Sequence, residues 1–145
     1  MPLRLKTPSA PVSASIPKIL VVDDSKTLRD LVGNALRPFI CDVTGSTNGF
    51  NALFSMERAL PDLILLDVNM PIMDGLEMLA LLKGKPTLQS IPVIMMTSPV
   101  DHVVAGQIAA LGVSGTVMKP FTPETLLEKI RSVLPLAPLP AVSSP

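Results

Sequence analysis

The segment PDLILLDVNMPIMDG (residues 61–75) combines an apolar run, one acid at its end, and a loop rich in methionine, proline and glycine. Residues 63–66 are all apolar instead of alternating with polar residues, which is typical of a strand buried on both faces of a sheet. Leucines at positions 76, 79 and 82 then share one helical face. The segment therefore predicts a buried strand that ends at Asp67, a loop and an amphipathic helix.

The rest of the chain repeats this order of elements. Other predicted strands are KILVVDD (18–24), the weaker ICDVTGS (40–46), IPVIMMTS (91–98) and the short GTVMKPF (115–121), and each is followed by a helical stripe. Doubly buried strands that alternate with amphipathic helices form parallel sheets with helices on both faces. We therefore predict an α/β fold with a five-stranded parallel sheet, whose strand order periodicity alone leaves open.

The fourth predicted helix begins after the strand that ends near residue 97. Ser98 has the place of a cap, Pro99 that of the first helical residue, and an acid follows at Asp101. The inward stripe of this helix is expected to consist of Val103, Val104, Ile108 and Leu111.

Composition sets the limits of the domain and the compartment. Of the 16 prolines, several gather near both ends, so residues 1–16 and 136–145 are expected to be disordered Pro/Ser-rich segments around a domain of residues 17–135. The zero net charge gives no reason to expect nucleic-acid or membrane binding. With Cys41 as the single cysteine and no signal peptide, we expect a cytoplasmic protein.

Polar side chains with chemical potential follow four of the predicted strands. Asp23 and Asp24 follow the first, Asp67 ends the third, Thr97 ends the fourth and Lys119 follows the fifth. The carboxyl ends of parallel strands meet at one edge of the sheet, where such folds bind ligands. Three carboxylates and one ammonium leave the site negative, which favours a hard cation such as Mg²⁺. A site of this kind suits transfer of a phosphoryl group to a carboxylate.

These motifs resemble a known family. The pair Asp23-Asp24, the segment LILLDVNMPIMDG, VIMMTS around Thr97, and Lys119-Pro120-Phe121 are similar to the receiver domain of response regulators over nearly all of residues 17–135. DVNMPIMDGLEML and GVSGTVMKPFT look especially like single-domain chemotaxis regulators. The resemblance implies a flavodoxin-like fold with strand order 2-1-3-4-5.

The resemblance also implies a role for each acid. Asp67 matches the phosphate acceptor, Asp24 the direct metal ligand, and Asp23 the acid that holds metal-bound water. The backbone carbonyl of Asn69 matches the third protein ligand of Mg²⁺, beside Asp24 and Asp67.

The remaining motif residues match supporting parts of a receiver site. Thr97 matches the hydroxyl that moves toward the phosphoryl group, Lys119 the lysine that pairs with it, and Pro120 a proline often preceded by a cis peptide bond. Met70, Pro71 and Gly75 match the loop that shapes the site, with turn formation and packing an equally good account of Met70 and Gly75.

A receiver of this kind takes its phosphoryl group from a histidine kinase or phosphotransfer protein and then binds a downstream protein. The resemblance implies no enzymatic activity beyond Mg²⁺-dependent autophosphorylation from a phosphodonor and slow autodephosphorylation. No output domain is expected, because only a proline-rich stretch follows residue 135. A monomer and a phosphorylation-dependent dimer both fit the sequence.

Two departures from the family pattern keep alternatives open. Thr116 stands where receivers commonly place an aromatic that turns inward on phosphorylation, which leaves the fourth helix and its preceding loop to carry the signal. Pro99, near the site, has no side-chain donor for an attacking water.

A phosphatase of the haloacid-dehalogenase type also uses Asp, Thr, Lys and further acids, but its acids come in another order. A scaffold that functions without phosphate is the third alternative.

Overall fold

Five parallel strands form one sheet in the computed structural model, which describes residues 16–140. The strand order is β2-β1-β3-β4-β5, which confirms the predicted topology. The strands are β1 (Lys18–Val22), β2 (Asp42–Ser46), β3 (Leu63–Asp67), β4 (Val93–Thr97) and β5 (Gly115–Met118). The predictions about residues 1–15 and 141–145 lie outside the described part of the chain.

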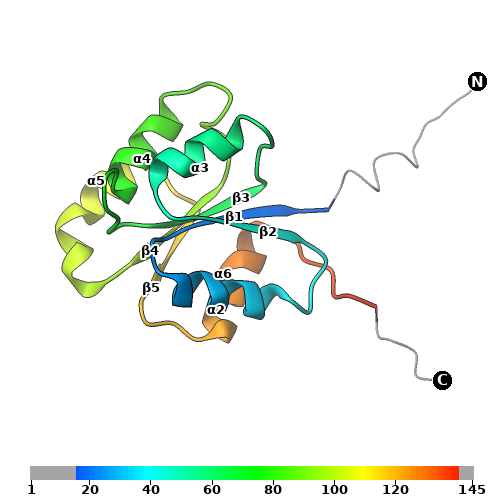
Figure 1. The fold of residues 1–145 in the computed structure, drawn as a ribbon. Helices are drawn as coiled ribbons and strands as arrows, with labels where there is room; N and C mark the ends of the chain where they lie inside the picture. Colours follow the sequence, from blue (N-terminus) through cyan, green and yellow to red (C-terminus); the bar gives the residue numbers. More distant parts are fainter. Residues whose placement is uncertain (1–15, 141–145) are drawn as a thin grey trace, which may run out of the picture.

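Helices cover both faces of this sheet (Figure 1). The α-helices are α2 (Lys26–Leu36), α3 (Gly49–Met56), α4 (Gly75–Lys83), α5 (Ala105–Leu111) and α6 (Pro123–Val133). In Figure 1, α3, α4 and α5 lie on one side of the sheet, and α2 and α6 lie on the other. Across residues 16–140, no helix is both long and apolar enough to cross a bilayer.

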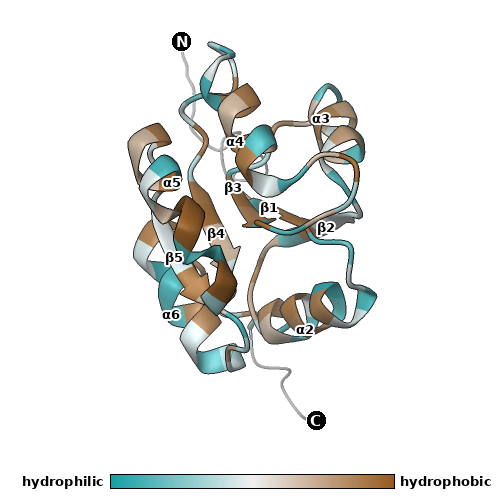
Figure 2. Cartoon of the chain, turned by 90° about the vertical axis from the view of Figure 1, so that its left-hand side faces the viewer, coloured by the Kyte–Doolittle hydropathy of each residue, from teal (hydrophilic) through white to brown (hydrophobic). Residues whose placement is uncertain are grey.

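The strand β3 shows why the apolar run in the sequence is continuous. Ile64 and Leu66 pack into the layer beneath α3, α4 and α5, whereas Leu63 and Leu65 pack into the layer beneath α2 and α6. All four are fully buried, because successive side chains of a strand point to opposite faces. In Figure 2 the central strands carry the hydrophobic colour, and the helices carry both colours.

The fourth helix differs from its prediction. Residues Pro99–Val104 form a 3-10 helix, η2, and the α-helix α5 begins only at Ala105. A 3-10 turn holds about three residues instead of 3.6, so the apolar stripe does not stay in phase. Val103 is 72% exposed, and Asp101 is the buried residue of η2, whereas Ile108 is buried as predicted.

The packed chain also extends beyond residue 135, where the sequence predicted a tail. Leu136 is only 7% exposed and belongs to the core beneath α2 and α6. The backbone N–H of Ile40 donates to the carbonyl of Ala137 at 2.8 Å, and Leu139 donates to Pro38 at 2.8 Å. Proline-rich composition prevents helix formation here but leaves an extended segment free to bury one leucine.

Candidate functional site

Three carboxylates lie together at the carboxyl edge of the sheet. One oxygen from each of Asp23, Asp24 and Asp67 lies within 4.8 Å of the other two. Asp23 is fully buried and Asp67 is 3% exposed, whereas Asp24 is exposed to solvent. The parallel pairing of β1 with β3 brings Val22 beside Leu66, so the acids that follow these positions become neighbours.

Lys119 connects the two buried acids across the sheet edge. Its Nζ donates to Asp23 Oδ2 and to Asp67 Oδ1, both at 2.9 Å. The lysine follows β5 directly, and the peptide bond between Lys119 and Pro120 is cis, the form the resemblance associates with this proline. One ammonium thus joins residues that lie 96 and 52 positions away along the chain.

Burial changes the protonation of Asp67. The pKa of this carboxyl is raised from 3.8 to about 6, chiefly by loss of solvent and also by the charge of Asp23, although the hydrogen bonds from Lys119 and Asn69 and the charge of Lys119 oppose the rise. Burial of the Lys119 ammonium acts to lower its pKa, but the hydrogen bonds to Asp67 and Asp23 outweigh burial and raise it. At neutral pH the site therefore holds an ionised Asp67 beside a charged Lys119.

The Thr97 hydroxyl lies on the same edge but is directed toward β5. Its hydrogen-bond contacts are the carbonyl of Val117 at 3.5 Å and the sulfur of Met118 at 4.0 Å, both at the long end for such bonds. The Thr97 hydroxyl is therefore weakly held in this position.

The loop after β3 packs closely against Asp67. The Asn69 backbone N–H donates to Asp67 Oδ1 at 3.3 Å, and the Gly75 N–H donates to the Val68 carbonyl at 2.8 Å. A Cβ atom on Gly75 would lie 2.1 Å from the Asp67 carbonyl oxygen, which only glycine avoids. Gly75 thus has a structural role, and Met70 is likewise buried in the core.

Two residues near the site have roles that the sequence did not reveal. Arg29 donates from Nη1 to the Asp23 carbonyl at 2.7 Å, and Asp101 accepts from Asn69 Nδ2 at 2.7 Å. Arg29 lies one helical turn after Ser25, the residue that caps α2. This distance from the cap was the one feature of the sequence that could have placed Arg29 near Asp23. Asp101 has the spacing of a helix-start acid, and nothing in the sequence predicts its bond to Asn69.

Thr116, which stands where receivers commonly have an aromatic residue, lies at the surface of the molecule. Thr116 is exposed on β5 and lines a hollow of about 280 Å³ that Pro99, His102 and Ile108 also line. The hollow lies between β5 and the η2–α5 segment, beside Thr97. The side chain of Thr116 is too short to fill the place that an aromatic ring would take.

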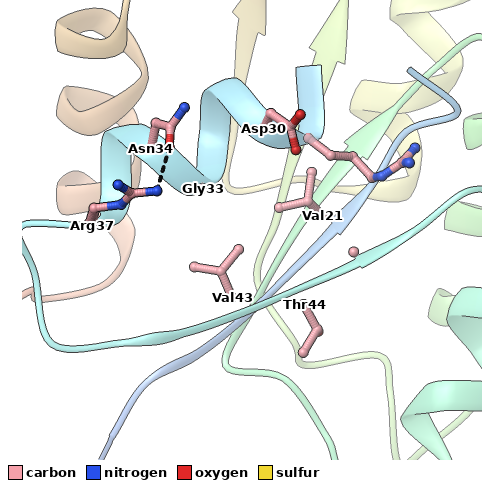
Figure 3. Close-up of a pocket in the computed structure, with 9 residues that line it drawn as sticks. Val21, Asp30, Gly33, Asn34, Arg37, Val43 and Thr44 are labelled. Carbon is pink, nitrogen blue, oxygen red and sulfur yellow. Dashed lines mark hydrogen bonds between the residues drawn. The ribbon is translucent and has the colours of Figure 1, made fainter. Parts of the chain in front are cut away.

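A second hollow lies apart from the acids, between α2 and β2 (Figure 3). It measures about 690 Å³, and Arg37 on its wall donates to Asn34 at 2.9 Å. Its lining includes none of Asp23, Asp67 and Lys119. This hollow is therefore not part of the acid cluster.

The donor set of the cluster fits one class of metal. The grouped ligand atoms are all carboxylate oxygens, without the histidine or cysteine ligands that zinc prefers. Hard cations bind such oxygens, and Mg²⁺ commonly combines one or two carboxylates with water and phosphate oxygens. The exposed side of Asp24 leaves room for such ligands, so the residues present fit Mg²⁺.

Comparison with known proteins agrees with this geometry. A family model described as the response regulator receiver domain matches residues 19–131. Protein PilG of Pseudomonas aeruginosa is 35% identical over 127 residues, which cover 87% of this chain and 94% of that protein. Chemotaxis protein CheY-3 of Vibrio cholerae is 35% identical over 117 residues, covering 80% of this chain and 90% of that protein.

The solved structures lead to the same family. The chemotaxis response regulator CheY4 of Vibrio cholerae superposes with a TM-score of 0.77 at 33% identity, covering 83% of this chain and all of that one. The match in fold therefore covers most of this chain. The chain belongs to the response-regulator receiver family, the phosphorylation-dependent switches of two-component signalling.

Proposed function

We propose that Asp67 accepts a phosphoryl group from a phosphohistidine of a histidine kinase or phosphotransfer protein, with Mg²⁺ bound at Asp23, Asp24, Asp67 and the Asn69 carbonyl. The observation that carries this proposal is the pair of 2.9 Å bonds from Lys119 to Asp23 and Asp67 beside a third acid. These contacts support the proposal, because the Asp67 carboxylate lies beside a positive charge and two further carboxylates that could share a cation.

The transfer step uses the ionised carboxylate of Asp67. One Asp67 oxygen attacks phosphorus, the P–O bond forms as the P–N bond of the donor breaks, and the electron pair stays on the departing imidazole nitrogen. The raised pKa of about 6 still leaves the carboxylate ionised at neutral pH. Mg²⁺, when bound, supplies positive charge to the phosphoryl oxygens.

Lys119 and Thr97 would contact the phosphoryl group once it is on Asp67. The Lys119 ammonium offsets the charge that the phosphoryl group adds, and it remains tied to the structure through Asp23. The weakly held Thr97 hydroxyl can turn from β5 to a phosphoryl oxygen. Slow hydrolysis of the acyl phosphate by water returns the free carboxylate, and Pro99 supplies no side-chain donor to that water.

The phosphorylated form acts by binding a downstream protein. Thr116 on β5 leaves no aromatic ring to move into the adjoining hollow, so η2 and α5 are the elements expected to report the phosphate. We expect this exchange to take place in the cytoplasm, and the unpaired Cys41 thiol agrees with a reducing compartment.

Acetyl phosphate provides a direct test. The protein is incubated with acetyl phosphate and Mg²⁺, and its intact mass is measured beside Asp67→Asn and the matched surface variant Asp30→Asn. The expected result is one added phosphate on the parent and on Asp30→Asn, and none on Asp67→Asn. An unlabelled parent protein contradicts the proposal, and equal labelling of Asp67→Asn moves the acceptor elsewhere. Rapid multiple turnover would instead indicate a phosphatase.

Two further measurements address the output. The phosphate mimic beryllofluoride is expected to shift backbone amide NMR signals between residues 99 and 111, where η2 and α5 lie. Unchanged signals there would exclude these elements as the output. Light scattering with and without beryllofluoride distinguishes a monomer from a phosphorylation-dependent dimer.

A further inference from the structure

Asp101 is a buried carboxylate that the proposed transfer does not use. Among residues 16–140, the buried charged side chains are Asp23, Asp67 and Asp101, and Asp101 is 6% exposed. A carboxylate so far removed from water is stable only when hydrogen bonds replace its hydration. The bonds of Asp101 therefore indicate what holds it in place.

Each oxygen of Asp101 accepts one short hydrogen bond. The backbone N–H of Ser98 donates to Oδ2 at 2.7 Å, and the side-chain Nδ2 of Asn69 donates to Oδ1 at 2.7 Å. Hydrogen bonds to an ionised acceptor are shorter and stronger than neutral ones. The first bond begins η2, and the second joins two loops that are 32 residues apart along the chain.

The second bond acts on a residue of the phosphorylation site. Asn69 also donates its backbone N–H to Asp67 Oδ1 at 3.3 Å, and its carbonyl is a proposed ligand of Mg²⁺. Because the side chain of Asn69 is held at Asp101, the orientation of its peptide group is held as well. Asp101 thus orients Asn69 through a hydrogen bond, as residues that hydrogen-bond a metal ligand commonly orient that ligand.

We propose that Asp101 is a positioning residue of the phosphorylation site: through Asn69 it fixes the carbonyl that binds Mg²⁺ and ties the loop after β3 to η2. This inference rests on the proposed function of Asp67 and extends it. The hydrogen bond between Asn69 and Asp101 also connects η2 directly to the loop beside Asp67. This connection could carry the signal that an aromatic residue carries in other receivers, because Thr116 stands in its place.

A capping role alone does not explain these contacts. A helix cap needs one acceptor oxygen, as with the half-buried Asp74, which forms a capping box with Glu77 at the start of α4. Asp101 is buried and uses its second oxygen on another loop. Asp74→Asn is therefore a matched control for the loss of a capping carboxylate.

The test is a double-mutant cycle on Mg²⁺ affinity. Dissociation constants for Mg²⁺ are measured by titration calorimetry on the parent protein, Asp101→Asn, Asn69→Ala and the double variant, with Asp74→Asn as control. Asp101→Asn keeps the shape but leaves one acceptor for two donors, and is expected to weaken Mg²⁺ binding about tenfold. In the Asn69→Ala background it should change the affinity by no more than about twofold.

A second readout does not depend on the metal. In the Mg²⁺-free protein, the side-chain amide signals of Asn69 in a nitrogen-15 NMR spectrum are expected to move in Asp101→Asn and to stay in place in Asp74→Asn. This measurement reports the link itself in a folded protein, even where a variant is less stable than the parent.

The outcomes separate this inference from the proposed function. If Asp67 is labelled but Asp101→Asn binds Mg²⁺ as the parent does, or weakens binding equally with and without Asn69, Asp101 is only a cap and the inference is wrong. If the parent protein neither binds Mg²⁺ nor becomes labelled, the proposed function fails, and the Asn69 amide signals alone decide whether the link exists.

Discussion

Replacing Asp67 with asparagine is expected to stabilise the Mg²⁺-free protein at neutral pH, although it abolishes the proposed acceptor. The folded state raises the pKa of Asp67 from 3.8 to about 6, so it favours the protonated form. The stability contributed by this preference is complete below the unfolded pKa and is lost as the pH rises through about 6. At about pH 7.5 the ionised carboxylate therefore opposes folding.

The size of the effect follows from the shift. Two pKa units correspond to about 3 kcal/mol, but asparagine also removes one of the two partners of Lys119. We therefore expect Asp67→Asn to raise the free energy of unfolding by about 1–2 kcal/mol at pH 7.5. At about pH 5 Asp67 is largely protonated in the folded state, so the linkage contribution falls to roughly half and most of the advantage of Asp67→Asn is lost.

Urea unfolding measures the difference. The chain has no tryptophan or tyrosine, so far-ultraviolet circular dichroism is the suitable signal, with EDTA present. Asp30→Asn serves as control, because Asp30 is exposed and paired only with Lys26, and such pairs contribute less than about 1 kcal/mol. Equal stability of Asp67→Asn and the parent at pH 7.5, or a difference that does not narrow at pH 5, would refute the reasoning.

Adding Mg²⁺ should narrow the difference in stability between Asp67→Asn and the parent protein. A ligand that binds only the folded state stabilises it by about 1.4 kcal/mol when its free concentration is ten times the dissociation constant. The parent protein is expected to gain this stability, while Asp67→Asn, which lacks one ligand, gains less.

Three further predictions concern the packing of the molecule and the pH dependence of the site. Gly75→Ala should lower the free energy of unfolding by about 1–3 kcal/mol in urea, because its Cβ would lie 2.1 Å from the Asp67 carbonyl oxygen; an unchanged midpoint would mean that the loop yields freely. Leu136→Ala should cost about 2–3 kcal/mol, whereas Leu139→Ala, at a 51% exposed position, should cost less than about 0.5 kcal/mol; equal effects would show that residue 136 is not part of the core. Mg²⁺ affinity should fall about tenfold between about pH 7.5 and pH 5 in calorimetry, because protons compete for Asp67 with its pKa near 6; a flat profile would contradict the raised pKa.

Much of the fold can be predicted from local sequence. The doubly buried strand β3 follows from four consecutive apolar residues, and the caps of α2 and α6 follow from Ser25 and Thr122. The acid cluster follows from one rule, that parallel strands bring their carboxyl ends to a common edge. Periodicity does not give the strand order, which the family resemblance supplied and the sheet confirms.

Other features depend on packing and could not be predicted. Val103 is exposed and Asp101 is buried because the chain enters α5 through a 3-10 turn, and the choice between 3-10 and α geometry depends on contacts with the neighbouring loop. Leu136 is buried because α2 and α6 leave an apolar surface beside it, which composition does not reveal.

The sequence alone decides which chemical groups lie at the carboxyl edge of the sheet. Each strand is recognised from a run of neighbouring apolar residues, and the polar residues that end or follow such a run lie at that edge. Only the tertiary structure decides which of those groups touch. Lys119 meets Asp23 from 96 residues away, and Asn69 meets Asp101 from 32 residues away. Such bonds depend on the relative positions of whole strands and loops, which packing of the two core layers sets.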